Sequence, residues 1–121
     1  MYGIKIKRVY DEATEDDGFR ILVDRLRPRG ISKDRINIDK WAKEIAPSTA
    51  LRKTFSHNEE TMDLFKAGYY FELDNNEAAV EFIDLLKGKL KEGNVTLLYA
   101  SKNTVYNHAL VLKDWIEERI I

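Results

Sequence analysis

Positive charge is concentrated in one short part of this chain, at the end of an apolar segment. Ile21 to Val23 are followed at once by Asp24 and Arg25. Residues 18 to 35 hold six cations against two acids, although the whole chain has a net charge of -1: Arg20, Arg25, Arg27, Arg29, Lys33 and Arg35. Buried strands of α/β proteins place ligand-binding residues beyond their carboxyl ends. We therefore predict that Arg25 and Arg29 bind an anion, with structural ion pairs as the alternative.

A second polar group follows the apolar segment Val95 to Tyr99, just before an expected helix. Its members that could bind an anion are Ser101, Lys102, Asn103 and Asn107. Backbone N–H groups are unpaired at a helix N-terminus and attract anions. We predict these four residues as further ligand-binding residues. The competing interpretation is that Asn103 or Thr104 only caps the helix.

Asp24 and His108 are the candidate catalytic residues, because a carboxylate and an imidazole can transfer protons. A histidine in the first turn of a helix has its charged form disfavoured by the helix dipole, which suits a neutral general base. The structural alternatives are an Asp24 that caps a loop and a His108 that is an ordinary surface residue.

Composition limits the chemistry that such a site can perform. The chain has no cysteine and two histidines. Disulfides, thiolate zinc sites and a cysteine nucleophile are thereby excluded, and we predict no metal site. No P-loop, nucleophile elbow or dinucleotide-binding motif occurs, so the sequence does not identify a cofactor, which stays unknown. Without an apolar run of membrane-spanning length or a signal peptide, we expect no membrane contact and a cytoplasmic location.

Apolar patterns predict a single α/β domain over residues 1–121, with a small three-stranded sheet that is at least partly parallel. The strands are expected in Ile4 to Val9, Phe19 to Asp24 and Val95 to Tyr99. Helices between the second and third strands are long enough for a crossover, so these two strands are expected to be parallel neighbours. Both polar groups would then meet at one edge of the sheet. The orientation of the first strand is open, and its alternating charges are typical of an edge strand.

About five helices are expected to cover this sheet, because apolar residues recur at helical spacing or follow capping residues in five stretches. In chain order, the stretches are marked by Ile38 with Trp41 and Ile45, by Leu51 with Phe55, and by the capping residues Asn58, Asn76 and Thr104.

Four motifs together resemble the YeaO-like family of conserved bacterial and archaeal proteins of unknown function. They are IKRVYD (Ile6 to Asp11), DDGFRILVDRLRPRG (Asp16 to Gly30), APSTALRKTF (Ala46 to Phe55) and VTLLYASKNTVYNHALVL (Val95 to Leu112). The resemblance covers nearly the whole chain in order. The resemblance implies that this chain has relatives in that family, but it implies no particular reaction.

Three residues depart from the pattern of that family. Members usually have tryptophan where this chain has Arg27 and Thr54, and aspartate where it has Asn103. The missing aspartate weakens any function that needs a carboxylate there. Longer relatives carry cysteine in the region of Tyr99 to Asn103, so their resemblance implies no thiol chemistry here.

These features favour an enzyme or sensor that binds a small ligand bearing phosphate or carboxylate, and they do not decide whether the chain catalyses a reaction. One alternative is a nucleic-acid-associated or regulatory binding module that uses the basic stretch. The net charge of -1 and the lack of a recognition-helix or stacking motif count against it. Another is a protein-interaction module that uses apolar residues such as Ile120 and Ile121. The oligomeric state is left open.

Overall fold

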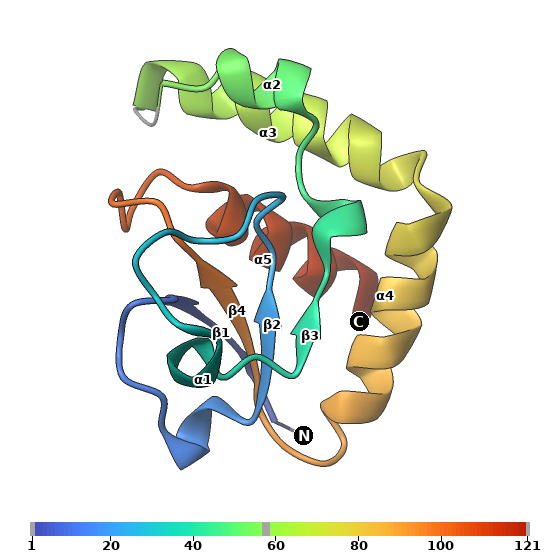
Figure 1. The fold of residues 1–121 in the computed structure, drawn as a ribbon. Coiled ribbons are helices and arrows are strands. Elements are labelled where there is room, and N and C mark those ends of the chain that lie inside the picture. Colours follow the sequence, from blue (N-terminus) through green and yellow to red (C-terminus); the bar gives the residue numbers. More distant parts are fainter. Residues whose placement is uncertain (1, 57–58, 121) are drawn as a thin grey trace.

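In the described part of the chain, four parallel strands form a sheet at the centre of the fold (Figure 1). The computed structural model describes residues 2–56 and 59–120, apart from the side chains of Lys33 and Asp34. The strands are β1 (Ile4–Arg8), β2 (Phe19–Leu22), β3 (Lys40–Trp41) and β4 (Val95–Tyr99), in the order β1-β4-β2-β3. The α/β class and the parallel pairing of β2 with β4 are confirmed, and β1 is an edge strand parallel to β4. The expectation of three strands was wrong.

The additional strand, β3, lies where a helix was expected. The backbone N–H of Asp39 donates to the carbonyl of Arg20 and that of Ala42 to the carbonyl of Leu22, both at 2.8 Å. These bonds attach the segment to β2, and a 3₁₀ turn (Lys43–Ile45) follows. Trp41 packs on one face of the sheet, whereas Ile45 belongs to the core on the other. Their helical spacing therefore did not reflect a shared helix face.

The other four expected helices are present among the described residues. They are α2 (Thr49–Lys53), α3 (Glu59–Asp74), α4 (Glu77–Lys89) and α5 (His108–Ile120). A single helical turn, α1 (Lys33–Ile36), is additional. Asn76 caps α4 as expected, because its side chain accepts a hydrogen bond from the Ala78 N–H at 3.0 Å. The expected cap Asn58 lies outside the described residues, within which no helix is long and apolar enough to cross a membrane.

Helices cover both faces of the sheet. In Figure 1, α5 lies behind the sheet and α1 in front of it, while α4 runs along one side and α2 and α3 lie across the top. Successive residues of a strand point to opposite faces, so Leu97 joins the large core under α5 while Leu98 joins a small cluster with Leu22 and Ile36 of α1. The carboxyl ends of the strands point toward α2 and α3.

A buried polar cluster lies on the α1 side of the sheet. Arg20 is 3% exposed and pairs with the fully buried Asp17. Its guanidinium also donates to the carbonyls of Asn37 at 2.7 Å and Ile36 at 3.2 Å, and the Thr96 hydroxyl donates to the Asp17 carbonyl at 2.7 Å. One cation of the basic stretch is therefore a structural residue that joins β2 to α1.

Candidate functional site

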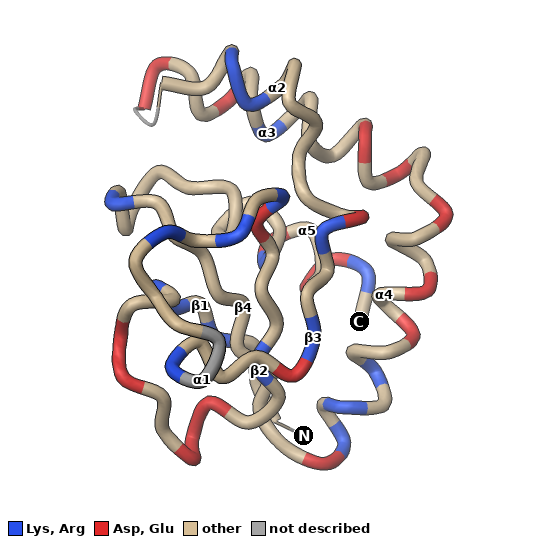
Figure 2. The backbone as a smooth tube through the Cα atoms, viewed as in Figure 1, with Lys and Arg blue, Asp and Glu red and all other residues tan. Residues whose placement is uncertain are grey.

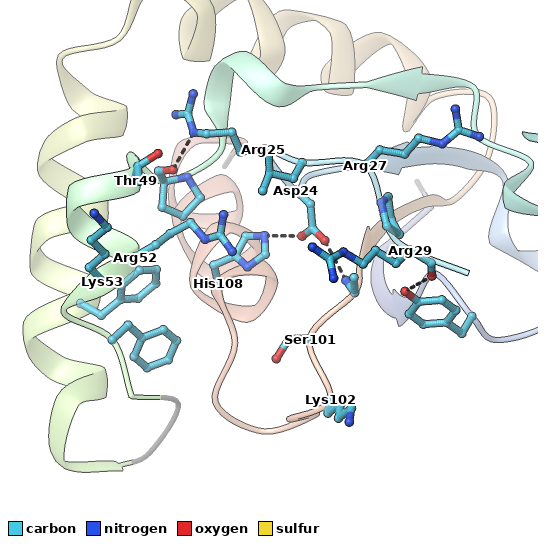
Figure 3. Close-up of a pocket in the computed structure, with 17 residues that line it drawn as sticks. Asp24, Arg25, Arg27, Arg29, Thr49, Arg52, Lys53, Ser101, Lys102 and His108 are labelled. Atoms are coloured by element: carbon cyan, nitrogen blue, oxygen red, sulfur yellow. Dashed lines mark hydrogen bonds and ion pairs between the residues drawn. The ribbon is translucent and has the colours of Figure 1, made fainter. Parts of the chain in front are cut away.

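A cavity of about 640 Å³ opens beyond the carboxyl ends of β2 and β4 (Figure 3). The two strands are parallel neighbours, with Leu22 paired to Leu98, so the polar segments that follow them lie side by side. Asp24 to Arg29 form one wall, Ala100 to Lys102 form a second, and α2 forms a third. The sequence-based expectation that the two segments meet at one sheet edge is thus confirmed by the strand pairing.

Six cations from three segments line this cavity: Arg25, Arg27, Arg29, Arg52, Lys53 and Lys102. Within residues 2–56 and 59–120, none of them forms an ion pair with a described carboxylate. Figure 3 shows the side chains of Arg29 and Arg52 reaching from opposite sides toward His108, while Arg25 and Arg27 point away from the centre. Positive charge without a carboxylate partner therefore collects on one concave surface.

Arg25 lines the cavity but has a structural role as well. Its Nε donates to the carbonyl of Pro47 at 3.2 Å and its Nη2 to the carbonyl of Ala46 at 3.1 Å. These bonds tie the end of β2 to the segment that leads into α2. Because two N–H groups of its guanidinium are already used, Arg25 has fewer donors for a ligand than Arg29 has.

Asp24 and His108 are in direct contact at the floor of the cavity. The distance between Asp24 Oδ1 and His108 Nε2 is 2.9 Å, and Nε2 is also 3.2 Å from the carbonyl oxygen of Val23. Because a carbonyl oxygen can only accept, Nε2 carries a hydrogen for Val23 and Nδ1 is the acceptor in the neutral ring. Oδ1 of Asp24 faces the ring but is buried without a hydrogen-bond partner among the described residues. The other carboxylate oxygen of Asp24 accepts the N–H of Ala100 at 2.9 Å. Asp24 therefore links the end of β2 to both β4 and α5.

Two predicted ligand-binding residues, Asn103 and Asn107, do not line the cavity. The Asn103 side chain accepts the N–H groups of Val105 at 2.9 Å and Tyr106 at 2.8 Å. Buried Asn107 accepts the N–H of Leu110 at 2.9 Å and donates to the Asn103 carbonyl at 3.1 Å. Because α5 begins at His108, Asn107 is its cap, and the expectation that Thr104 caps this helix was wrong. Ser101 and Lys102, in contrast, do line the cavity.

Arg52 and Lys53 of α2 were not predicted as site residues, because they lie far from both polar segments along the sequence. The available signal was Ser48, whose side chain accepts the Leu51 N–H and starts a helix that places Arg52 one turn later. Two cations in the last turn of a helix are also what a helix dipole favours, so this signal was not specific.

Contacts with α3 fix the position of α2. Glu72 accepts hydrogen bonds from the N–H of Ser48 at 2.9 Å and from its hydroxyl at 2.6 Å. Gly68 lets the helices approach closely, because a Cβ atom there would lie 2.7 Å from Leu51 Cδ1. The wall that carries Arg52 is therefore held by a hydrogen-bonded carboxylate and by a close helix contact.

The cavity also has an apolar lining: Tyr10, Leu26, Pro28, Pro47, Phe55 and Phe65. The rings of Phe55 and Phe65 stack with their centroids 4.2 Å apart. Tyr10 is held in place by its hydroxyl, which donates to the carbonyl of Arg29 at 2.6 Å. Among the described residues, no group of three histidine, aspartate or glutamate side chains is placed to hold a metal ion. The cavity thus offers cations, hydrogen-bonding groups and apolar surface.

Comparison with known proteins identifies the family. Residues 3–121 match the family described as "Inactive DUF488-N3 subclade". This chain belongs to that family. It is 49% identical to the uncharacterized protein YeaO of Escherichia coli (strain K12) over 114 residues, which cover 94% of this chain and 96% of YeaO. It is 35% identical to the uncharacterized protein Rv3073c of Mycobacterium tuberculosis (strain ATCC 25618 / H37Rv) over 116 residues, which cover 96% of this chain and 95% of that protein.

Membership in the family confirms the resemblance that the sequence motifs indicated. The uncharacterized protein Mb3100c of Mycobacterium bovis (strain ATCC BAA-935 / AF2122/97) has the same identity and coverage, 35% over 116 residues, 96% of this chain and 95% of its own length. No solved structure matches the chain significantly. All segments that line the cavity lie within residues 3–121, so the cavity belongs to the part of the chain that defines the family.

Proposed function

We propose that this protein binds a small anionic molecule, bearing phosphate or carboxylate, in the cavity beyond β2 and β4, and that it acts as a sensor or binding module. One observation carries the proposal: six cations without a described carboxylate partner line a single cavity. Like charges that line one concave surface raise the local positive potential. An anion bound there would relieve this repulsion.

The carboxylate of Asp24, which also lines the cavity, forms no ion pair with these cations. One of its oxygens accepts the Ala100 N–H, and the other faces His108. Arg29 and Arg52 are then the natural anion-binding groups, because their side chains reach toward His108 from opposite walls (Figure 3). Guanidinium groups suit this function, since they present paired N–H donors that match the oxygens of phosphate and carboxylate.

The family description favours binding over catalysis, because it names an inactive subclade. The observation that favours an enzyme is the contact between Asp24 and His108 at 2.9 Å. A carboxylate that orients an imidazole is an arrangement used in general base catalysis. An enzyme is therefore the second candidate. It would use Nδ1 of His108 as the proton acceptor.

The charge distribution argues against an extended nucleic-acid surface. Figure 2 shows blue segments on the loops above the sheet, on α2 and on the lower part of α4, with red segments along α3 and the upper part of α4, so charges of both signs alternate over the molecule. A protein that grips a nucleic acid backbone needs a basic stripe or face. The protein-interaction alternative receives little support from the C-terminus, because Ile120 packs against the core and Ile121 lies outside the described residues.

A thermal-shift screen of the whole chain tests anion binding. Phosphate, sulfate and small carboxylates should raise the midpoint of unfolding, because they bind only the folded state. The double variant Arg29→Gln, Arg52→Gln should lose most of this shift, whereas Lys87→Gln, which removes an exposed cation of α4 outside the cavity, should keep it. No shift with any anion would contradict the proposal. Tight DNA or RNA binding that weakens steeply with salt would support the nucleic-acid alternative instead.

A further inference from the structure

The cavity has an exposed apolar rim next to its cations. Leu26 is 67% exposed and Tyr10 is 37% exposed, and both line the cavity. Leu26 belongs to the loop that carries Arg29, and Tyr10 donates a hydrogen bond to the Arg29 carbonyl. Exposed apolar side chains beside a polar concave site are typical of surface that a ligand covers.

The opposite wall repeats this combination of ring and cation. The N–H of Phe55 donates to the carbonyl of Arg52 at 3.2 Å, so the two residues are about one helical turn apart on this wall. Phe65 stacks against Phe55 and keeps its ring in place. Both walls therefore contribute an aromatic side chain and an arginine to the lining, although Phe55 is only 8% exposed and Tyr10 is the more accessible ring.

The size of the cavity exceeds what a simple anion needs. Its volume of about 640 Å³ falls in the range of about 300–1,000 Å³ that is typical of sites for drug-sized molecules. An inorganic phosphate could contact the cations but would leave the apolar rim in water. A larger molecule that carries both a ring and an anionic group would use the whole lining.

We infer that the ligand of this cavity is an aromatic phosphate of about mononucleotide size. Its phosphate lies between Arg29 and Arg52, and its ring lies against the apolar rim formed by Leu26 and Tyr10. This inference rests on the proposed anion-binding function and adds the class of ligand to it. A phosphate monoester carries a charge of about −1.5 to −2 near neutral pH and three acceptor oxygens, which suits two guanidinium groups that approach from opposite walls. An aromatic ring adds stacking energy beyond that of the buried area alone.

Isothermal titration calorimetry of the whole chain with four probes tests the inference. The probes are adenosine 5′-monophosphate, ribose 5-phosphate, adenosine and inorganic phosphate. We expect adenosine 5′-monophosphate to bind about tenfold more tightly than ribose 5-phosphate, which lacks the ring, and than adenosine, which lacks the phosphate. Equal affinity of adenosine 5′-monophosphate and ribose 5-phosphate would overturn the inference but leave anion binding standing. Failure of every phosphate probe to bind would overturn the inference, and the proposed function would fall with it only if sulfate and small carboxylates also gave no thermal shift.

Two cavity variants and one control separate the contributions of ring and phosphate. Leu26→Ser removes exposed apolar surface at little cost in stability, and it should weaken adenosine 5′-monophosphate binding about threefold while leaving ribose 5-phosphate unchanged. Arg52→Gln should weaken both phosphates, and Lys87→Gln should weaken neither. If Leu26→Ser weakened both phosphates equally, the ring would not contact the rim and the inferred ligand class would be wrong.

Discussion

Oδ1 of Asp24 lies 2.9 Å from Nε2 of His108, so the carboxyl end of β2 is joined directly to the first residue of α5. The same carboxylate accepts the N–H of Ala100, the residue after β4. A single side chain thus connects three elements that border the cavity. It also places negative charge among the cations, and this opposes the binding of an anion.

We predict that Asp24→Asn lowers stability while strengthening anion binding. The neutral amide weakens the hydrogen bond from Ala100 and removes the negative charge that faces His108, with an expected loss of about 1–3 kcal/mol in the free energy of unfolding. Removal of the negative charge makes the cavity more positive, so phosphate should bind more tightly. Urea denaturation and a phosphate titration measure the two effects, with the exposed Asp63→Asn as control. Weaker phosphate binding in Asp24→Asn would mean that Asp24 contacts the ligand or shapes its site.

Arg25 and Arg29 should respond differently to replacement by alanine. Arg25→Ala leaves the carbonyls of Pro47 and Ala46 without their donor, so we expect it to cost about 1–2 kcal/mol of stability. Arg29 is exposed and its side chain has no described carboxylate partner, so Arg29→Ala should stay within about 0.5 kcal/mol of wild type. In thermal-shift measurements, Arg29→Ala should show the larger loss of phosphate-induced stabilisation. If Arg29→Ala lost more stability, or Arg25→Ala lost more of the phosphate-induced stabilisation, Arg29 would be the structural residue and Arg25 the anion-binding one.

The convergence of the two polar segments could be predicted from the sequence, because parallel neighbouring strands end at the same edge of a sheet. The contribution of Arg52 could not be predicted in this way. Its position depends on how α2 rests on α3, through Glu72 with Ser48 and through Leu51 against Gly68. Such contacts are not encoded in the local pattern around α2.

Asn103 and Asn107 show a second limit of sequence reasoning. An asparagine that binds an anion and one that caps a helix need the same side chain at the same place before a helix. Only the backbone path decides, and here both side-chain oxygens accept backbone N–H groups of the chain itself. A similar ambiguity affected β3, because Trp41 and Ile45 have helical spacing but belong to opposite faces of the sheet.

Gly18 should tolerate no side chain. Its φ is 65°, and a Cβ atom there would lie 2.0 Å from the carbonyl oxygen of Asn94. That carbonyl also accepts the N–H of Phe19 at 2.9 Å, so it cannot move without loss of a bond beside β2. We expect Gly18→Ala to cost about 2–4 kcal/mol in chemical denaturation. Gly93→Ala is the matched control, because no atom lies within 4 Å of a Cβ at that position. Equal stability of the two variants would contradict this account of the turn before β2.

Asp17 should make the protein sensitive to acid. Burial raises the pKa of this carboxyl. Hydrogen bonds from the Thr14 backbone and from the side chains of Lys7 and Arg20 lower the pKa by more than burial raises it, so the net value is about 2. Because its folded pKa is below the unfolded value of 3.8, its stabilising contribution is complete above about pH 4. That contribution is lost as the pH falls toward 2, and it amounts to about 2 kcal/mol.

The titration of Asp17 can be followed directly by NMR of its carboxyl carbon, with the exposed Asp16 as an internal comparison. We expect the midpoint to lie near the folded pKa of this carboxyl, about 2. The variant Asp17→Asn should be strongly destabilised at neutral pH, because it leaves the buried guanidinium of Arg20 without its carboxylate. Its remaining stability should fall less steeply between pH 4 and pH 2 than that of wild type, because the titrating group is gone. A midpoint near 3.8 in the folded protein would show that the cluster of Lys7 and Arg20 does not hold Asp17 ionised.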